Sequence, residues 1–471
     1  DQGCAGNLVG NRTGGCEMSR KYFGTDGVRG RVGQSPITPD FVMRLGYSAG
    51  KVLLDRSQMP AGERPAVLIG KDTRLSGYML ESALEAGFSA AGVEVCLVGP
   101  LPTPAVAYLT RALRLQAGIV ISASHNPYYD NGIKFFDNEG NKLNTSVEAM
   151  IEELYQNDEA IEFSQKRERE IGSSKRIDDV IGRYIVHIKN SFPKNLSLKG
   201  IRIVIDAANG AAYKVAPTIF SELGADLIVI NDQPNGFNIN EKCGALHPSK
   251  LAEEVLKFRA DIGFALDGDA DRLVVVDEKG NVIDGDKLIA ALAMHLKNQG
   301  LLNKSSAVAT VMSNGAMEDY FGANGINLFR CNVGDKYVLE VLQREGLNFG
   351  GEQSGHIVFS DYAKTGDGLA SALQTIAYVL ATGKPASIAL NPFELYPQLQ
   401  EAISVKTKKP LEEIDGFSQI LKELDDKHIR HLIRYSGTEN KLRVLLEGRK
   451  ESQLAKELDK TVDFLRNALN A

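Results

Sequence analysis

The sequence lacks several features that would assign a class at once. It has no tryptophan, only five cysteines, and no apolar run near the roughly 20 residues that cross a bilayer. Its 54 Lys and Arg stand against 60 Asp and Glu, which gives a net charge of −6 and no general affinity for nucleic acid backbone. We therefore expect a globular protein with no membrane or nucleic-acid partner, in which a local cluster of basic residues must hold any anionic ligand.

The few cysteines indicate a reducing compartment. Cys96, Cys243 and Cys331 are far apart and show no CxxC spacing, so we expect buried free thiols rather than metal ligands or catalytic residues. The other two lie in residues 1–17, a polar and Gly-rich leader without the apolar core of a signal peptide. We expect the folded chain to start at Met18 and the protein to be cytoplasmic.

A strand, loop, helix and strand pattern occurs three times along the chain. Each copy has an apolar β-rich run, a small polar or Gly-containing loop, a helical stretch, a glycine and a second β-rich run. The copies span residues 66–98, 201–230 and 307–329. Strands that alternate with helices pair in parallel, because the helix supplies the crossover that parallel neighbours need. The pattern predicts three related α/β domains with mixed sheets.

The last part of the chain has a different pattern and predicts a smaller α+β domain. Three β-like runs precede a final amphipathic helix that carries apolar residues at helical spacing. Polar breaks at 152–175 and 382–393 help to separate the units. We expect a leader at 1–17 and domains at 18–172, 173–281, 282–390 and 391–471, the four domains meeting at a central cleft.

Three aspartates, Asp267, Asp269 and Asp271, follow an apolar run at 262–266. Carboxylates at i, i+2 and i+4 with small residues between them can turn toward one point and offer the oxygen ligands that Mg²⁺ or Ca²⁺ prefers. A solvated acidic turn is the alternative, but crowding three carboxylates without a cation is costly. An EF-hand loop does not fit, since Arg272 stands where that loop needs Gly.

Ser124 begins a Ser-His-Asn-Pro loop directly after a buried β-like run at 119–122. This position exposes a hydroxyl at the carboxyl end of a strand, where open α/β sheets bind ligands. An ordinary turn stays open as an alternative, because Ser and Asn before Pro are common turn residues. A Ser-His-Asp hydrolase is disfavoured, since the chain has no GxSxG elbow and adjacent Ser and His side chains usually diverge.

Two further loops carry groups that suit a sugar phosphate. Residues 434–439, with Arg443 beyond them, combine guanidinium groups, hydroxyls and a Gly-centred turn, which are the components of a phosphate cradle. Residues 350–356 place a carboxylate, an amide, a hydroxyl and an imidazole in one Gly-flanked loop. A plain solvated loop is the alternative for both. Residues 24–30 are Gly-rich and contain Arg29, but this segment is not specific by itself.

Taken together and in this order, these segments resemble the α-D-phosphohexomutase superfamily from about Met18 to the C-terminus. The opening Lys-Tyr-Phe-Gly-Thr-Asp-Gly-Val-Arg-Gly, the serine segment Ser-His-Asn-Pro-Tyr-Tyr-Asp-Asn-Gly-Ile-Lys and the Gly-Glu-Gln-Ser-Gly-His loop are most similar to the bacterial phosphoglucosamine mutases within it. Relatives that act on mannose or glucose phosphates more often carry Met or Glu where Gln353 stands.

The resemblance implies an isomerase that interconverts glucosamine 6-phosphate and glucosamine 1-phosphate on the route to UDP-N-acetylglucosamine, a peptidoglycan precursor. It implies that Ser124 rests as a phosphoserine, that glucosamine 1,6-bisphosphate is the intermediate and activator, and that Glu352 and Ser354 read the sugar. Mg²⁺ would be bound by the Ser124 phosphate together with Asp267, Asp269 and Asp271. The non-reacting phosphate would be held by Arg434, Ser436, Gly437, Thr438 and Arg443.

The resemblance also suggests roles for three further residues, and the chain departs from the family pattern at two positions. Lys134 and His356 are our candidates for proton transfer or phosphate contact, and Arg29 would help to neutralise charge on the transferred phosphoryl group. Asn440 occupies a place where the family often has Pro. Asp335 lies where relatives of other specificity can carry His, so we assign no base there.

Alternative functions remain open at this point. Within the superfamily, the alternative is phosphomannomutase or phosphoglucomutase specificity. From another class, the alternative is a Mg²⁺-dependent sugar-phosphate phosphatase or a non-catalytic sensor. We expect a monomer or homodimer that acts on a small-molecule sugar phosphate, with a hinge near residues 385–395 that lets the fourth domain open while the bisphosphate turns.

Overall fold

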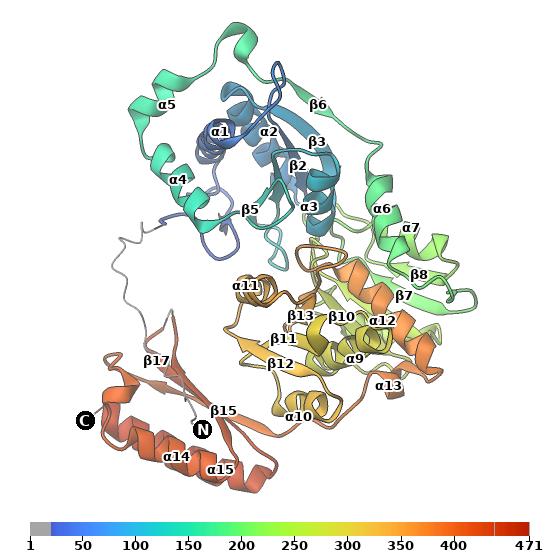
Figure 1. Cartoon of the computed structure of the whole chain (residues 1–471), viewed down its shortest axis with the longest axis vertical. Helices are drawn as coiled ribbons and strands as arrows, with labels where there is room; N and C mark the ends of the chain where they lie inside the picture. The colour runs from blue at the N-terminus through green and yellow to red at the C-terminus, as the bar shows by residue number, and fades with distance from the viewer. Residues whose placement is uncertain (1–19, 438, 471) are drawn as a thin grey trace, which may run out of the picture.

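The computed structural model of the chain describes residues 20–437 and 439–470, so the expected leader at 1–17 and Thr438 lie outside the described residues. Within this range, four sheets follow one another along the chain. Figure 1 shows the four units along an arc, the first in blue at the top and the fourth in red at the lower left. This is the predicted architecture of three α/β domains and a smaller C-terminal α+β domain.

The first domain has a six-stranded sheet in the order β1-β5-β4-β2-β3-β6. Its strands are β1 (Val28–Arg31), β2 (Ala66–Lys71), β3 (Glu94–Pro100), β4 (Ala117–Ile121), β5 (Asp130–Asp137) and β6 (Ser174–Arg176). Its helices are α1 (Pro39–Arg56), α2 (Leu75–Ala90), α3 (Thr103–Ala112), α4 (Thr145–Tyr155) and α5 (Asp158–Ser164).

The second and third domains have four-stranded sheets in the orders β10-β9-β7-β8 and β12-β11-β13-β14. The second contains β7 (Arg202–Asp206), β8 (Asp226–Ile230), β9 (Ile262–Leu266), β10 (Leu273–Asp277), α6 (Ile181–Asn190), α7 (Val215–Glu222) and α8 (Ser249–Lys257). The third contains β11 (Ser306–Thr310), β12 (Asn327–Cys331), β13 (Phe349–Gly351), β14 (Ile357–Phe359), α9 (Gly285–Asn298), α10 (Gly315–Ala323), α11 (Asp335–Glu345), α12 (Gly368–Thr382) and α13 (Ala386–Ala389).

The fourth domain is a three-stranded antiparallel sheet in the order β15-β17-β16 with two helices. Its elements are β15 (Gln398–Ser404), β16 (Arg430–Tyr435), β17 (Lys441–Glu447), α14 (Phe417–Asp426) and α15 (Glu451–Leu469). Apolar residues of α15 pack on the sheet and form a core within this domain.

One four-stranded unit is common to the first three domains. Its first strand pairs in parallel with the second, as the three sequence repeats predict, and also with a third strand that lies outside the repeats. A short loop then leads from the third strand to an antiparallel fourth strand, in the pairs β4–β5, β9–β10 and β13–β14. The serine loop, the aspartate triplet and the 352–356 loop therefore occupy the same topological position in three domains.

The polar segment at 152–175, expected as a break between units, is structured for much of its length. It contains α5 and leads into β6, which pairs in parallel with β3, so the first sheet reaches a few residues beyond the boundary that we expected at 172. All three β6 residues are exposed. A fully polar edge strand has no apolar face, so hydrophobic periodicity could not reveal it.

The buried apolar clusters of the fourth domain and of the first three domains are separate. One cluster spans the first three domains, with α6 and α12 among its elements, and further clusters lie within each of these domains. Among the described residues, the fourth domain has a cluster of its own. The three cysteines at 96, 243 and 331 are free, the first two buried as expected and the third only partly buried. Across residues 20–437 and 439–470, no helix has the length and apolar character needed to cross a membrane.

Candidate active site

Ser124 and the aspartate triplet meet where the first domain contacts the second. Ser124 follows β4, is 2% exposed, and its Oγ donates a hydrogen bond to Oδ2 of Asp267 at 2.8 Å. Its backbone has a φ of 53°, in the left-handed region that few non-glycine residues adopt. Backbone strain of this kind concentrates at functional sites, where the surrounding structure must maintain it.

A buried hydrogen-bond network maintains the Ser124 conformation. The Ser124 amide donates to Oγ of Ser122 at 3.0 Å, and that hydroxyl donates to Asp72 at 2.6 Å. Asp72 in turn pairs with the fully buried Arg74. From the second domain, Nδ2 of Asn240 donates to the Ser124 carbonyl at 2.9 Å. Both domains thus hold the serine at one place.

The three aspartates form an oxygen-rich cluster that suits Mg²⁺. One ligand oxygen from each of Asp267, Asp269 and Asp271 lies within 4.8 Å of the others, and all three side chains are buried. Burial and the two neighbouring carboxylates raise the pKa of Asp267 well above its usual range. Oδ1 of Asp269 and Oδ1 of Asp271 are buried without a hydrogen-bond partner among the described residues. Crowded carboxylates with unused lone pairs are the donor set of a hard divalent cation.

Asp269 is the member of the triplet that the first domain holds directly. The Lys134 ammonium lies 2.7 Å from its Oδ2, and the Thr103 hydroxyl donates to the same oxygen at 2.6 Å. Burial alone would raise the pKa of Asp269, but Lys134 and Thr103 outweigh burial and lower it. This carboxylate therefore stays ionised.

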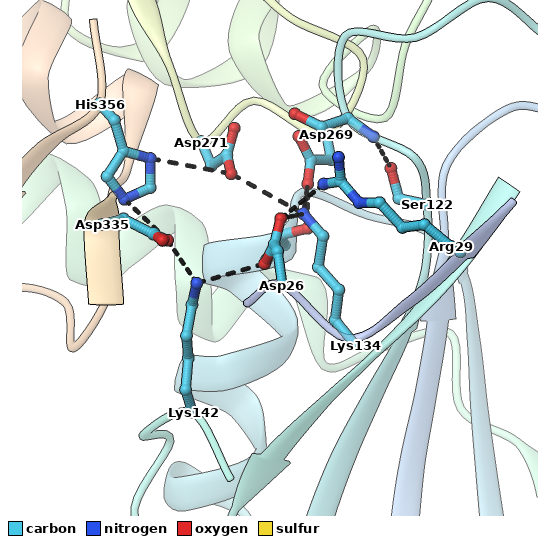
Figure 2. A network of polar contacts seen from close by, with 12 residues as sticks. Asp26, Arg29, Ser122, Lys134, Lys142, Asp269, Asp271, Asp335 and His356 are labelled. Atoms are coloured by element: carbon cyan, nitrogen blue, oxygen red, sulfur yellow. Dashed lines mark hydrogen bonds and ion pairs between the residues drawn. The ribbon is translucent and has the colours of Figure 1, made fainter. Parts of the chain in front are cut away.

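Lys134 itself lies among three carboxylates (Figure 2). Besides Asp269, its Nζ lies 3.6 Å from Asp26 and 3.8 Å from Asp271. Burial disfavours the ammonium form, but the carboxylates outweigh burial and raise the pKa of Lys134. A permanently charged amine suits phosphate contact better than proton abstraction.

A second group of charges links the first domain to the third. Lys142 bridges Asp26, at 3.2 Å, and Asp335 at the start of α11. The buried His356 lies between two carboxylates, with Nε2 3.5 Å from Asp335 and Nδ1 3.9 Å from Asp271. Figure 2 shows these side chains converging from the first three domains.

A cavity of about 380 Å³ opens beside these groups, a size suited to a hexose phosphate. Residues from the first three domains line it: Thr25, Asp26, Arg29, Ser124, Asp271, Arg272, Thr310, Met312, Val333, Gly334, Asp335, Glu352, Gln353, Ser354 and His356. Five of the residues predicted as catalytic or sugar-binding, Arg29, Ser124, Glu352, Ser354 and His356, are thus brought together. Lys134 does not line the cavity, but it forms ion pairs with two residues that do, Asp26 and Asp271.

The predicted phosphate cradle lies elsewhere. Arg434 and Arg443 face each other across β16 and β17, and Ser436 and Gly437 follow in the turn. Both guanidinium groups are exposed, and like charges on directly opposed residues favour an anion between them, although the Glu439 carboxylate already lies 3.8 Å from Arg443. Among the described members of the cradle, none lines the 380 Å³ cavity. The structure therefore does not bring the cradle to Ser124.

Sequence reasoning missed four of the charged or polar residues at this site. Asp26 lies in the Gly-rich opening segment, from which the sequence predicts a role for Arg29 alone. Asp335 stands out in the sequence only as a departure from some relatives, with no predicted role. Lys142 and Thr103 stand in no motif. The position of Asp26, three residues before Arg29 in the same Gly-rich segment, could have indicated a role for it. Only the packing of domains reveals Thr103.

His125, next to Ser124, is set up as a neutral group. Burial and the nearby guanidinium groups of Arg272 and Arg29 lower the pKa of His125 to about 4. The imidazole is therefore uncharged at neutral pH and does not compete with the arginines for an anion.

Comparison with known proteins matches four family models to this chain in order. They are the phosphoglucomutase/phosphomannomutase α/β/α domain I at residues 20–162, domain II at 182–280, domain III at 284–396, and the C-terminal domain at 397–464. Together they match well over half of the chain.

Curated relatives are similar over almost the whole length. Phosphoglucosamine mutase of Wolinella succinogenes is 61% identical over 449 residues, which are 95% of this chain and 99% of the relative. Phosphoglucosamine mutase of Nitratiruptor sp. is 58% identical over 450 residues, which are 96% of this chain and all of the relative. The enzyme of that name from Helicobacter pylori is 56% identical over 449 residues, 95% of this chain and 100% of the relative.

Solved structures share the fold at low identity. A phosphoglucomutase/phosphomannomutase family protein from Burkholderia thailandensis has a TM-score of 0.77 at 23% identity, covering 96% of this chain and 98% of that chain. N-acetylphosphoglucosamine mutase of Aspergillus fumigatus, in complex with GlcNAc-6P and magnesium, has a TM-score of 0.62 at 17% identity, covering 96% and 97%.

Proposed function

This chain belongs to the phosphoglucomutase/phosphomannomutase family, and we propose that it acts as a phosphoglucosamine mutase, an isomerase that interconverts glucosamine 6-phosphate and glucosamine 1-phosphate. One observation carries the proposal. The Ser124 hydroxyl lies 2.8 Å from Asp267, inside a cluster of three buried carboxylates, at the edge of a hexose-sized cavity. Relatives of that activity are 56–61% identical over nearly the whole chain.

The four domains would each contribute one part of the site. We assign the phosphoserine loop to 18–172, the metal loop to 173–281, the sugar-reading loop to 282–390 and the phosphate cradle to 391–471. Phosphorylated Ser124 and the three aspartates would hold Mg²⁺, which supplies neutralisation of the charge that develops on the transferred phosphoryl oxygens.

The transfer itself follows from the positions of the chain's own groups. Ser124 would give its phosphoryl group to O1 of glucosamine 6-phosphate, so that the P–Oγ bond breaks and a P–O1 bond forms. Over the step Oγ gains a proton to become the serine hydroxyl, and O1 loses one. The O1 hydroxyl proton needs an acceptor, and we propose His356, whose buried imidazole lines the cavity. Arg29 and Arg272 also line the cavity and would contact the phosphoryl oxygens, while Lys134 keeps Asp269 ionised.

The product of this step is glucosamine 1,6-bisphosphate, which must turn end for end before its 6-phosphoryl group returns to Ser124. A cradle that accepts either phosphate serves this turn, and we assign it to Arg434, Ser436, Gly437, Thr438 and Arg443. The cradle lies outside the cavity, on a domain with its own apolar core. A movement of the fourth domain would therefore bring the arginines to the substrate and exclude water.

The experiment that tests this function compares three substrates. Glucosamine 6-phosphate, glucose 6-phosphate and mannose 6-phosphate are assayed for isomer formation and for free phosphate, with and without glucosamine 1,6-bisphosphate. We expect isomerisation of the glucosamine ester to be fastest and to depend on the bisphosphate. A preference for mannose or glucose phosphate would contradict the specificity, and stoichiometric phosphate release without isomer would indicate a phosphatase.

Ser124→Ala is the matched variant for this assay. It should abolish isomerisation, and phosphopeptide mapping should find phosphate on Ser124 of the wild-type chain after incubation with the bisphosphate. Ser146→Ala is a suitable control, because Ser146 is an exposed serine of the same domain. Isomerisation retained by Ser124→Ala would rule out the phosphoserine mechanism.

A further inference from the structure

We infer that Asp286 is a positioning residue, which holds the sugar-reading loop in place through the side chain of Gln353. The inference rests on the proposed function, because it concerns the loop that carries Glu352 and Ser354. Asp286 lies in the first turn of α9, is 3% exposed, and does not line the cavity. Its effect on the substrate must therefore pass through its neighbours, of which Gln353 lies in the sugar-reading loop.

The contact between Asp286 and Gln353 follows from the hydrogen-bond groups around the amide. In the orientation that satisfies both ends of the amide, the Gln353 NH₂ group donates to Oδ2 of Asp286 and to the carbonyl of Met312, each at 3.1 Å. The same Oδ2 also accepts from the backbone N–H of Asn314 at 2.9 Å. Asp286 thus joins the sugar-reading loop to the loop after β11.

The backbone contact beside it is equally close. A Cβ on Gly285 would overlap the carbonyl oxygen of Gln353, so the start of α9 can approach the loop only because position 285 is glycine. The helix start therefore fixes both the backbone and the side chain of Gln353. Its two neighbours, Glu352 and Ser354, are cavity residues.

The chemistry of this contact explains why a glutamine stands at position 353. Both partners, a carboxylate and a carbonyl, accept hydrogen bonds, so the position needs a neutral donor. A methionine there would leave Asp286 with one partner fewer. A glutamate would place a second carboxylate against a buried one, which is costly unless one of them takes up a proton.

Titration of Asp286 makes this interaction measurable. Burial raises the pKa of Asp286 to about 6, and the like charge of Asp284 also raises it. The backbone N–H of Asn314 and the guanidinium of Arg330 lower the pKa but do not outweigh burial. Because the folded-state pKa lies above the unfolded value, the stability that Asp286 contributes is complete at low pH and is lost as the pH rises through about 6.

The same residues reach toward the fourth domain. The Asn314 side chain exchanges two hydrogen bonds with the backbone of Tyr396, at 3.0 and 3.1 Å, just before β15. Asp286 therefore ties the sugar-reading loop to the segment on which the fourth domain is attached.

The test is a double-mutant cycle on the full chain with Q353E, D286N and the double variant, measured at about pH 8 and about pH 5.5. At the higher pH, we expect Q353E to raise KM for glucosamine 6-phosphate about tenfold and to change kcat less, because two carboxylates repel in the loop. At the lower pH, the increase should fall to about threefold, because one carboxyl is protonated. At the higher pH, KM of the double variant should be at least about fivefold lower than KM of Q353E, and it should no longer depend on pH.

Two controls separate this proposal from its premise. Q343E adds the same charge to an exposed glutamine of α11 and should leave KM unchanged. Thermal unfolding of the same four proteins reports the contact without any assay of activity. Additive Tm changes in the cycle at both pH values would refute the contact, and coupled Tm changes with an unchanged KM would refute the positioning role. A wild-type chain with no mutase activity, but with coupled Tm changes, would refute the proposed function alone.

Discussion

Asp269 shows how single residues set the charge of the site. It receives a hydrogen bond from the Thr103 hydroxyl and an ion pair from Lys134, and both come from the first domain. These two donors keep Asp269 ionised, whereas burial raises the pKa of Asp267 and of Asp271. The first domain thus prepares one fixed negative charge in the aspartate cluster of the second.

Thr103→Val tests this arrangement with almost no change in side-chain volume. The substitution removes a hydrogen bond to a charged group, which contributes about 1.5–3 kcal/mol. We expect the Mg²⁺ concentration at half-maximal activity to rise about tenfold, since partners of metal ligands affect metal affinity to this degree. A magnesium titration of the activity measures the change.

Thr103→Ser is the control, because it keeps the hydroxyl. Its magnesium titration should match that of the wild-type chain within about twofold. Equal titration curves for the valine variant and the wild-type chain would show that Thr103 has no influence on metal binding by the three aspartates.

Among the elements, the loops that follow the third strand of each repeated unit carry the candidate site residues. The loops between β4 and β5 and between β9 and β10 touch directly, because the carbonyl of Ser124 lies over Gly268. The loop between β13 and β14 comes from the third domain and lines the same cavity. The three domains share one topology, and their equivalent loops meet at one cavity.

Gly268→Ala tests the contact between the first two loops. An ideal Cβ at this position would lie 2.5 Å from the Ser124 carbonyl oxygen and 2.9 Å from Nδ2 of Asn240. We expect a loss of about 1–3 kcal/mol in stability from overpacking. We also expect a fall in kcat of about tenfold or more, because the serine must move. Calorimetry and steady-state kinetics measure the two effects.

Gly182→Ala is the matched control, since a Cβ there meets open space in α6. It should leave kcat unchanged and raise stability by up to about 1 kcal/mol through helix propensity. If the Gly268 variant behaves like the Gly182 variant, the two loops do not constrain each other.

For the whole molecule, the important division lies between the first three domains and the fourth. One buried apolar cluster spans the first three domains, whereas the described part of the fourth has a cluster of its own. A polar contact joins them: Arg430 donates to the carbonyls of Val311 and Ser313 at 2.6 and 2.9 Å and pairs with Glu447 at 2.9 Å. Glu447 also accepts from the N–H of Gly315 at 2.8 Å. Directional bonds of this kind can hold one arrangement and break when the domain moves.

Arg430→Met tests the importance of this contact. It leaves the Glu447 carboxylate buried without its guanidinium partner, which should lower stability by about 2–3 kcal/mol. This is less than the loss from breaking a fully buried ion pair, because Arg430 is partly exposed. We expect a separate, earlier calorimetric transition for the fourth domain and faster hydrogen exchange in residues 385–397. Arg466→Met, which removes an exposed pair with Glu401, should change stability by less than about 0.5 kcal/mol. Identical calorimetric traces for both variants would show that Arg430 does not hold the fourth domain.

Much of the fold could be read from the sequence because its signals are local. Apolar runs, glycines after helices and the three repeats predict the parallel pairs β2–β3, β7–β8 and β11–β12, and the structure confirms these pairs. The serine and aspartate loops could be singled out for the same reason, because each carries its functional groups within a few consecutive residues. The strand β6 could not, since a polar edge strand depends on its neighbour and not on its own composition.

The packing of the domains, and not the sequence of any one segment, sets which groups from different domains share one charge network. Thr103, Lys142 and Asp335 are far apart in the sequence, yet packing places them around the aspartate cluster and its neighbours. The position of Gln353 against Asp286 is likewise set by the packing of α9 on a distant loop. A sequence pattern predicts the chemistry that one segment can offer, whereas distance and burial, which determine pKa and hydrogen bonding, arise only when the domains pack together.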